Sequence, residues 1–391
     1  MSTTQQLPLF DASPAPPPIT GRTVLEFFAG VGLARIGFEQ AGWQVVWAND
    51  YDEMKRRQYE GHFGPSPHLS GEDIHALADR PDELPTALLA HASFPCTDLS
   101  LAGGRRGLNA GESSAYWGFH QILAGLGERR PPLVLLENVT GLISSHGGRD
   151  FRAAASALCD LGYVVDAVVL DAAHFVPQSR PRLFIIAKPR PPAANRNTQP
   201  AESVLRPRKL IDVIEANADL AWDHCDLPPP PAKSEQSLAD LLDDLPDDSP
   251  QWWDAERAEY LLSQMSERHR AIADEMIAGD RWRAGGVFRR VRNGKSMAEL
   301  RTDGLAGCLR TPKGGSGRQI LFQAGFGRYR VRLLNADECA RLMGAEGYRV
   351  TGTLNQALFG FGDGVCVSVV RWIAENYLNP LAEKIARTKS Y

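Results

Sequence analysis

The chain has 391 residues, 43% of them hydrophobic and 23% charged, with a formal net charge of −4. This composition is typical of a soluble globular protein with room for two domains. Its apolar runs fall short of the roughly 18 residues that a membrane-spanning helix needs, so we predict no association with a membrane.

Residues 1–20 are rich in Pro, Ser and Thr and lack the basic start and apolar core of a signal peptide, so we expect a disordered leader. The six cysteines include no C-x-x-C pair and are too few for a disulfide framework. The sequence therefore predicts no metal site, and it favours a reducing, cytoplasmic location.

Residues 21–189 alternate between apolar strands, glycine turns and helices. We expect strands over 23–30, 43–50, 84–96, 131–139, 164–172 and 182–189, and helices over 33–42 and 151–163. This alternation predicts an α/β fold, a doubly wound and mostly parallel sheet whose ligand site lies at the carboxyl ends of the strands.

The pattern changes after Pro189. Pro-rich linkers occur at 188–200 and 227–236. Residues 211–260 carry a net charge of about −12, and residues 281–332 carry about +11. We expect residues 190–350 to form an inserted, substrate-facing domain, with loops and short strands over 281–332. Residues 351–391 are expected to return to the first domain as a helix.

The basic block at 281–332 has two interpretations. It is the charge pattern of a phosphate-binding face, or it is an arginine-rich surface paired with the acidic block.

The stretch FFAGVG, Phe27 to Gly32, follows the first expected strand. Its glycines allow a tight turn close to a ligand, but Arg35 stands where a dinucleotide-binding motif needs a third small residue. Asp50 ends the next strand, where a carboxylate can bind ribose hydroxyls. Together, the glycine turn and Asp50 predict a site for a nucleoside cofactor. The alternative is that the glycines only form a turn between a strand and a helix.

Three further motifs carry ionisable or nucleophilic groups. SFPCTDLS places Cys96 after Pro95, either as a nucleophile or as a buried thiol at the end of a strand. LLENV places Glu137 at the end of an apolar strand, where burial raises the pKa of a carboxyl unless the group is paired. PQSRPRL places Arg180 and Arg182 on one face of a strand, suited to a carbonyl oxygen or an anion.

The order of these motifs resembles the C5-cytosine DNA methyltransferases of bacterial restriction–modification systems. GEDI after the second strand, RLLNADECARLMG and FGDGV extend the resemblance, which covers residues 23–189 and 330–378. It implies a Rossmann-like methyltransferase domain, 21–189, with an inserted target-recognition domain, 190–350.

The resemblance implies that Cys96 is the nucleophile that adds to C6 of a flipped-out cytosine. Glu137 would hold the N3 and N4 edge of the base, Asn138 would order the turn, Arg180 would bind O2, and Arg182 would support the site. The methyl group would come from S-adenosyl-L-methionine. The residues implied at this cofactor are Phe28, Ala29, Gly30, Gly32, Asp50, Tyr51, Asp73, Ile74, Pro95 and Asp363.

Double-stranded DNA is the implied partner, and a cognate restriction endonuclease is compatible with the family. Residues 101–114 resemble the mobile catalytic loop, in which Arg105 and Arg106 would touch phosphates. Arg310, Lys313 and Arg318 of the basic block would add DNA contacts.

Two positions depart from the family pattern. Asp363 replaces a frequent asparagine near the cofactor's methionine end, and Ala102 replaces a common serine of the catalytic loop. Two alternatives stay open: a tRNA cytosine-5 methyltransferase on the same scaffold, and an inactive DNA-binding relative. The chain lacks the Cys-Phe-Thr signature of the tRNA branch, and its intact Cys96, Glu137 and Arg180 disfavour the inactive relative.

Overall fold

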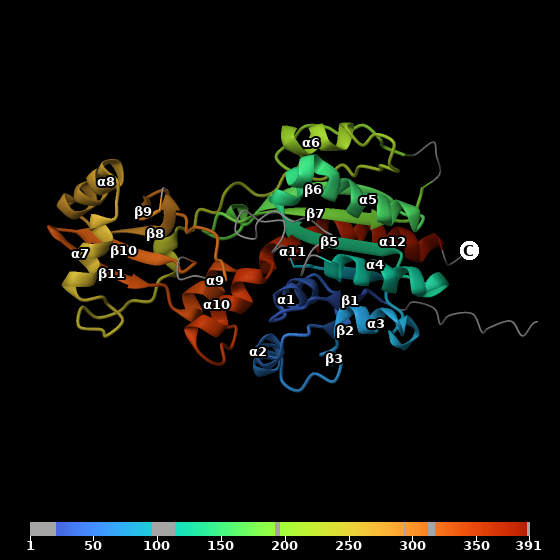
Figure 1. Ribbon diagram of the computed structural model, residues 1–391, viewed down its shortest axis with the longest axis horizontal. Helices are drawn as coiled ribbons and strands as arrows, with labels where there is room; N and C mark the ends of the chain where they lie inside the picture. Colours follow the sequence, from blue (N-terminus) through green and yellow to red (C-terminus); the bar gives the residue numbers. More distant parts are fainter. Residues whose placement is uncertain (1–20, 96–113, 192–195, 293, 312–316, 389–391) are drawn as a thin grey trace, which may run out of the picture.

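The computed structural model describes residues 21–95, 114–191, 196–292, 294–311 and 317–388. Figure 1 shows two bodies beside each other along the longest axis. The large body holds a seven-stranded sheet. The small body, which we define as residues 254–333, holds a four-stranded sheet and two helices.

The seven-stranded sheet has the order β3-β2-β1-β4-β5-β7-β6. β7 runs antiparallel to both β5 and β6, and the other neighbours are parallel. This arrangement confirms the predicted mostly parallel α/β sheet. Its strands are β1 (Thr23–Phe27), β2 (Gln44–Asn49), β3 (Leu69–Ser70), β4 (Leu89–Ala92), β5 (Leu133–Val139), β6 (Val164–Asp171) and β7 (Pro181–Lys188).

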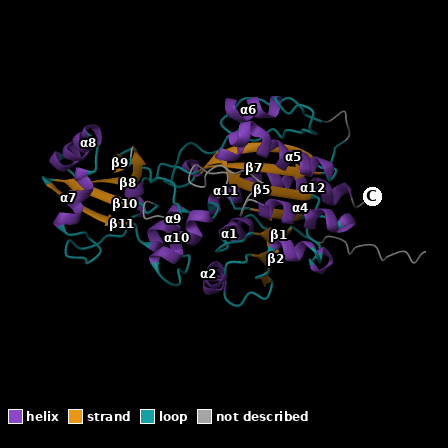
Figure 2. Cartoon of the chain, viewed as in Figure 1, coloured by secondary structure: helices purple, strands orange, loops and turns teal. Residues whose placement is uncertain are grey.

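Helices cover both faces of this sheet (Figure 2). On one face, Phe119 and Leu158 pack with Leu25 of β1. On the other face, Phe38 and Val370 pack with Val24. Strands buried on both faces are mostly apolar, which is why these segments were recognisable in the sequence, although Glu26, His91 and Asp166 are buried within them. The helices of the large body are α1 (Leu33–Gln40), α2 (Glu53–Phe63), α3 (Ile74–Ala78), α4 (Ala115–Gly125), α5 (Arg149–Asp160), α6 (Arg208–Glu215), α9 (Ala336–Leu342), α10 (Leu354–Asp363), α11 (Val367–Ile373) and α12 (Asn379–Thr388).

The small body contains an antiparallel sheet of order β11-β10-β8-β9. Its elements are α7 (Ala255–Ser263), α8 (Glu267–Ala278), β8 (Arg283–Arg292), β9 (Lys295–Arg301), β10 (Ile320–Gly325) and β11 (Arg328–Leu333). We expected loops and short strands here, and β8 extends over 10 residues. Exposed arginines on these strands hid the alternating pattern, because only one face is buried against α7 and α8.

The expected boundary at residue 190 does not coincide with the division into two bodies. Leu210 and Ile214 of α6, together with Trp222, belong to the same core as α4 and α5. The backbone of Trp222 also bridges to Val165 of β6. Residues 196–227 therefore pack on the large sheet and not in the small body.

The C-terminal stretch 354–388 is long and apolar enough to cross a membrane by length and composition alone. Within its most apolar window, 67% of the residues are buried inside the protein. Its α11 packs on α1 so closely that a Cβ at Gly37 would lie 2.7 Å from the Cβ of Val370. We therefore interpret this stretch as core helices of the large body.

Candidate active site

The predicted site residues gather at one edge of the large sheet. β1, β2, β4 and β5 are parallel, so their carboxyl ends meet there. The glycine turn follows β1, Asp50 follows β2, Pro95 follows β4, and Glu137 and Asn138 close β5. Cys96, the predicted nucleophile, comes directly after Pro95 and lies outside the described residues.

The turn after β1 has an unusual backbone. Phe28, Gly30 and Gly32 have φ angles of 58°, 59° and 80°, a region that side chains with a Cβ rarely adopt. A Cβ at Gly32 would lie 2.4 Å from the Phe63 ring, so close packing also demands glycine there. A Cβ at Gly30 would meet nothing within 4 Å, so open space lies over this residue.

Asp50 is tied to the glycine turn. Its Oδ2 accepts a hydrogen bond from the Gly30 amide at 2.8 Å, and its Oδ1 accepts one from the Asp52 amide at 2.9 Å. Burial raises the pKa of this carboxyl, against the opposing charge of Lys55. The structure thus joins the two features that predicted a nucleoside site, the glycine turn and the acid after the second strand.

The remaining predicted cofactor residues differ in exposure. Tyr51 is 59% exposed beside Asp50, whereas Ile74 is only 4% exposed and packs in the core. The Asp73 carboxylate caps α3 by accepting a hydrogen bond from the His75 amide at 2.8 Å. Ala29 is buried at the start of the glycine turn.

Asp363 has a partner that the sequence did not reveal. Lys55 Nζ lies 2.8 Å from Asp363 Oδ2, and this ion pair joins α2 to the end of α10. Burial lowers the pKa of Lys55, but the carboxylates of Asp363 and Asp50 outweigh it, so the pKa is raised overall. The positive charge of Lys55 therefore offsets the negative charge of Asp363, the residue that stands where the family frequently has an asparagine.

Glu137 is a buried carboxyl held beside an arginine. Its exposed fraction is 5%, and its Oε1 lies 3.0 Å from Nε of Arg182. Burial raises the pKa of Glu137, although Arg182, Arg180 and a hydrogen bond from Ser93 oppose the shift. A carboxyl in this setting keeps its proton to a higher pH than an ordinary glutamic acid does.

Asn138 connects β5 to the turn that precedes Cys96. Its Nδ2 donates to the Phe94 carbonyl at 3.1 Å, and its Oδ1 accepts from the Val139 amide at 2.9 Å. The expectation that Asn138 orders a turn therefore has a geometric basis. The turn in question is the one that leads to the predicted nucleophile.

Arg180 and Arg182 have different surroundings. Arg180 is 1% exposed, and its guanidinium donates to the carbonyls of Leu309, Gly362 and Gly364 at 2.9, 2.8 and 2.6 Å. Arg182 is the arginine that pairs with Glu137. The structure thus places Arg182 beside the Glu137 carboxyl. Arg180 instead connects its own segment to Leu309 and to the segment that contains Gly362 and Gly364.

Gln178, Ser93 and Cys308 also belong to this region, and we did not predict them as site residues. Gln178 is fully buried, with its Nε2 donating to the Leu342 carbonyl at 2.7 Å and its Oε1 accepting from the Leu309 amide at 2.9 Å. Its place in the Gln-x-Arg-x-Arg motif was a usable signal. Nothing in the sequence around Cys308 marked that residue.

Three of the five predicted DNA-contacting residues, Arg105, Arg106 and Lys313, lie outside the described residues. Arg310 is exposed, and Arg318 donates to Oδ1 of Asn355 at 2.5 Å.

Several arginines of the basic block pair with nearby acids, such as Arg292 with Glu299 and Arg301 with Asp303. Arg330 pairs with Asp247 of the acidic block. Part of the basic block is therefore an arginine-rich surface paired with acids, as the second interpretation expected.

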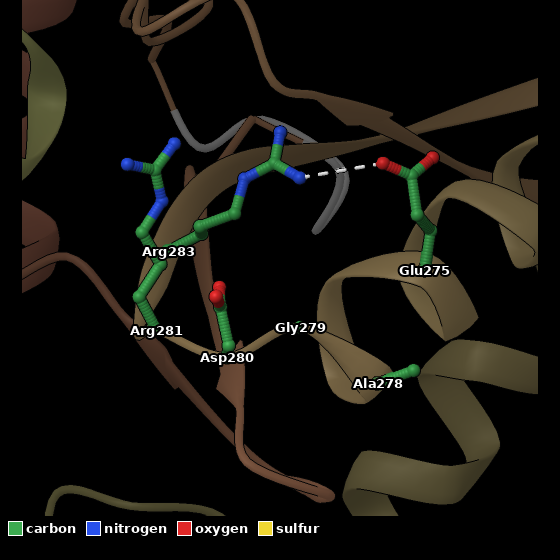
Figure 3. Close-up of a pocket in the computed structure, with 6 residues that line it drawn as sticks. All are labelled: Glu275, Ala278, Gly279, Asp280, Arg281 and Arg283. Atoms are coloured by element: carbon green, nitrogen blue, oxygen red, sulfur yellow. Dashed lines mark ion pairs between the residues drawn. The ribbon is translucent and has the colours of Figure 1, made fainter.

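Figure 3 shows a pocket in the small body. Its volume is about 650 Å³. Arg283 and Glu275 form an ion pair of 3.5 Å across it, and Asp280 and Arg281 lie beside them. None of its six lining residues is a predicted site residue. We therefore place the candidate active site at the strand ends and not in this cavity.

Comparisons with known proteins agree with this geometry. The chain is 28% identical over 358 residues to the Type II methyltransferase M.DsaV of Dactylococcopsis salina, covering 91% of this chain and 85% of the relative. It is 26% identical over 364 residues to M.HhaI of Haemophilus parahaemolyticus, covering 92% and 94%. The match to M.NgoBI of Neisseria gonorrhoeae is 33% identical but spans 163 residues, 41% of this chain and 49% of the relative.

The fold is shared with solved structures. The Dnmt2 methyltransferase of S. pombe superposes with a TM-score of 0.62 at 19% identity, covering 92% of this chain and 99% of that one. The sequence profile of the C-5 cytosine-specific DNA methylases matches residues 22–379. This chain therefore belongs to the family of C-5 cytosine-specific DNA methylases and is a cytosine-5 DNA methyltransferase.

Proposed function

We propose that this protein transfers a methyl group from S-adenosyl-L-methionine to C5 of a flipped-out cytosine in a short, specific sequence of double-stranded DNA, with Cys96 as the nucleophile. The observation that carries this proposal is the hydrogen bond from Asn138 to the Phe94 carbonyl at 3.1 Å. It connects the strand that holds Glu137 to Phe94, which comes two positions before the proposed nucleophile in the sequence.

Cytosine C5 is a weak nucleophile, and addition of a thiolate at C6 makes it reactive. In the proposed reaction the Cys96 sulfur forms a bond to C6, and N3 gains a proton from Glu137. C5 then takes the methyl group and loses its own proton. The C5 proton goes to a base, and the electron pair of the C5–H bond forms the C5–C6 double bond as the bond between sulfur and C6 breaks and releases the thiolate. N3 returns its proton to Glu137, so the enzyme is regenerated.

The raised pKa of Glu137 supports the role of proton donor to N3, because the proton is kept nearer to neutral pH than in an ordinary glutamic acid. We assign the contact with the O2 carbonyl to Arg182, which pairs with Glu137 at 3.0 Å. Arg180 was our first expectation for that contact. Its guanidinium already donates to three main-chain carbonyls, so we assign it to holding the wall of the site.

The residues around the glycine turn fit an S-adenosylmethionine site. Open space lies over Gly30, and Asp50 presents a buried carboxylate beside it. We propose that Asp50 binds the ribose, that Phe28 and Tyr51 contact the adenine, and that Gly30 and Gly32 admit the methionine moiety. When bound, this cofactor supplies an electrophilic methyl group.

We further propose that the exposed arginines of the basic block contact DNA phosphates and that the protein acts in the bacterial cytoplasm. Its relatives M.DsaV and M.HhaI are named Type II methyltransferases, which supports a role in restriction–modification. A nuclease partner would be encoded separately.

Base-resolution mapping of 5-methylcytosine tests the proposal. DNA is taken from methylation-free bacteria that express this chain or its Cys96→Ala variant. We expect methylation confined to one short motif and lost in the variant. Unmethylated DNA from bacteria with folded, cofactor-binding protein would refute it. Total RNA from the same cells would then distinguish a tRNA methyltransferase from an inactive DNA-binding relative.

A further inference from the structure

Cys308 contributes a second thiol to the active-site region, from the segment that joins β9 to β10. Its sulfur accepts a hydrogen bond from Nη1 of Arg180 at 3.2 Å and lies 3.8 Å from Nη2 of Arg182. Arg182 in turn pairs with Glu137. A continuous polar chain therefore runs from Glu137 through Arg182 to Cys308 and Arg180.

The backbone around Cys308 is anchored independently of its side chain. Ala306 N donates to the Pro177 carbonyl at 2.8 Å, and Ser179 N donates to the Ala306 carbonyl at 3.1 Å. Leu309 N donates to the side chain of Gln178. Removing the thiol should therefore leave residues 306–309 docked beside the two arginines.

The Cys308 thiol lies beside two positively charged guanidiniums, where a negative charge would be stabilised. Two guanidiniums share a buried space, and Arg182 lowers the pKa of Arg180 beyond the effect of burial. Burial alone would raise the pKa of the Cys308 thiol, but Arg180 and Arg182 outweigh it and lower the pKa. A thiolate there offsets the repulsion between the arginines, and it contacts Nη2 of Arg182 while Glu137 contacts Nε.

We propose that Cys308 is a positioning residue of the methyltransferase: its sulfur holds Arg180 and Arg182 as a pair and thereby sets the place of Arg182 beside Glu137. Cys308 lies on the connection between β9 and β10 of the small body, and its neighbours Ala306 and Leu309 pack in a core with residues of the large body. This contact therefore also couples the docking of the small body to the proposed catalytic carboxyl. The inference rests on the proposed function of Glu137 and Arg182.

A first experiment measures the ionisation of Cys308 without any activity assay. The ultraviolet absorbance of thiolate is followed against pH in Cys96→Ala and in Cys96→Ala/Cys308→Ser, and the difference reports Cys308. We expect it to titrate below the ordinary thiol pKa of about 8.5. Titration at or above that value would overturn the proposal. This outcome is independent of whether the chain methylates DNA.

A second experiment measures kcat, KM and the pH profile of kcat for three variants with otherwise unchanged cysteines. Cys308→Ala and Cys308→Ser should lower kcat about 10-fold and leave KM for the methyl donor unchanged, because only the arginine pair is disturbed. Cys308→Asp restores an anion and should recover most of kcat. The acid limb of the pH profile of kcat for Cys308→Asp should move to lower pH, because a carboxyl has a lower pKa than a thiol.

Cys159→Ser is the matched control, since Cys159 lies on α5 and contributes nothing to the site. Thermal unfolding of each variant shows whether it folds. A folded Cys308→Ser enzyme with the kcat and pH profile of the unchanged protein would overturn the proposal. If the unchanged protein itself transfers no methyl group, the proposed function fails, while the thiolate titration still decides the ionisation of Cys308.

Discussion

Replacing Glu26 by glutamine should stabilise the protein strongly at neutral pH. Glu26 lies in the middle of β1, opposite His91 of β4, and is 1% exposed. Burial raises the pKa of its carboxyl from an ordinary value of 4.5 to about 8, and the charge of Arg35 offsets only part of this effect. The Glu26→Gln side chain has the same shape and carries no ionisable proton.

The magnitude follows from proton linkage. Between pH 4.5 and about pH 8 the folded state keeps a proton that the unfolded state releases. The free energy of unfolding therefore falls with rising pH by about 1.4 kcal/mol per pH unit. At pH 7 the accumulated loss is about 3 kcal/mol, and it is absent below pH 4.5. Glu26→Gln removes the loss and should be more stable by that amount at pH 7.

Urea unfolding at pH 5, 6, 7 and 8, followed by circular dichroism, checks this expectation. The gain in the free energy of unfolding should grow across the series and level off near pH 8. Glu60→Gln is the control for the chemical change itself, because Glu60 is exposed on α2. A gain for Glu26→Gln that is the same at every pH, or no gain at all, would refute the reasoning.

Four further outcomes are expected. Glu137→Gln should lower kcat by roughly 10²- to 10⁴-fold, because it removes the proton donor to N3; a near-normal rate in a turnover assay would exclude that role. Asn138→Ala loses the 3.1 Å bond to the Phe94 carbonyl and should lower kcat more than it changes KM, at a cost in stability of roughly 1–3 kcal/mol; unchanged kcat would mean that the turn is held by other contacts. Asp363→Asn breaks the ion pair with Lys55. Because the aspartate is half exposed, the free energy of unfolding should change by less than about 1 kcal/mol, and a larger loss in calorimetry would contradict this. DNA affinity should fall steeply with salt in filter-binding assays if the basic block contacts phosphates, whereas a flat dependence would contradict that placement.

The elements of the large sheet were predictable because parallel strands buried on both faces are nearly continuous apolar runs, interrupted in β1 by Glu26 and in β4 by His91. The positions of the glycine turn, Asp50, Glu137 and Asn138 were predictable for a related reason. Each comes at the end of such a strand, and parallel strands end at the same edge. The order of the motifs along the chain then indicated the family.

The pairing of charges was decided by the tertiary structure. Arg180 and Arg182 alternate along one segment and looked equivalent in the sequence, yet Arg182 reaches Glu137 while Arg180 reaches carbonyls more than 100 residues away. Lys55 and Asp363 are 308 positions apart. No local pattern encodes such contacts, because each depends on where the two segments lie after folding.

The extent of the small body was decided in the same way. Residues 196–227 follow a Pro-rich linker and looked like the start of the inserted domain, but Leu210 and Trp222 bury their side chains in the core of the large body. The amino-acid composition showed where the chain changes from alternating strands and helices to Pro-rich and charged segments. Which surface an amphipathic segment covers depends on the apolar face left open beside it, and only the folded chain contains that information.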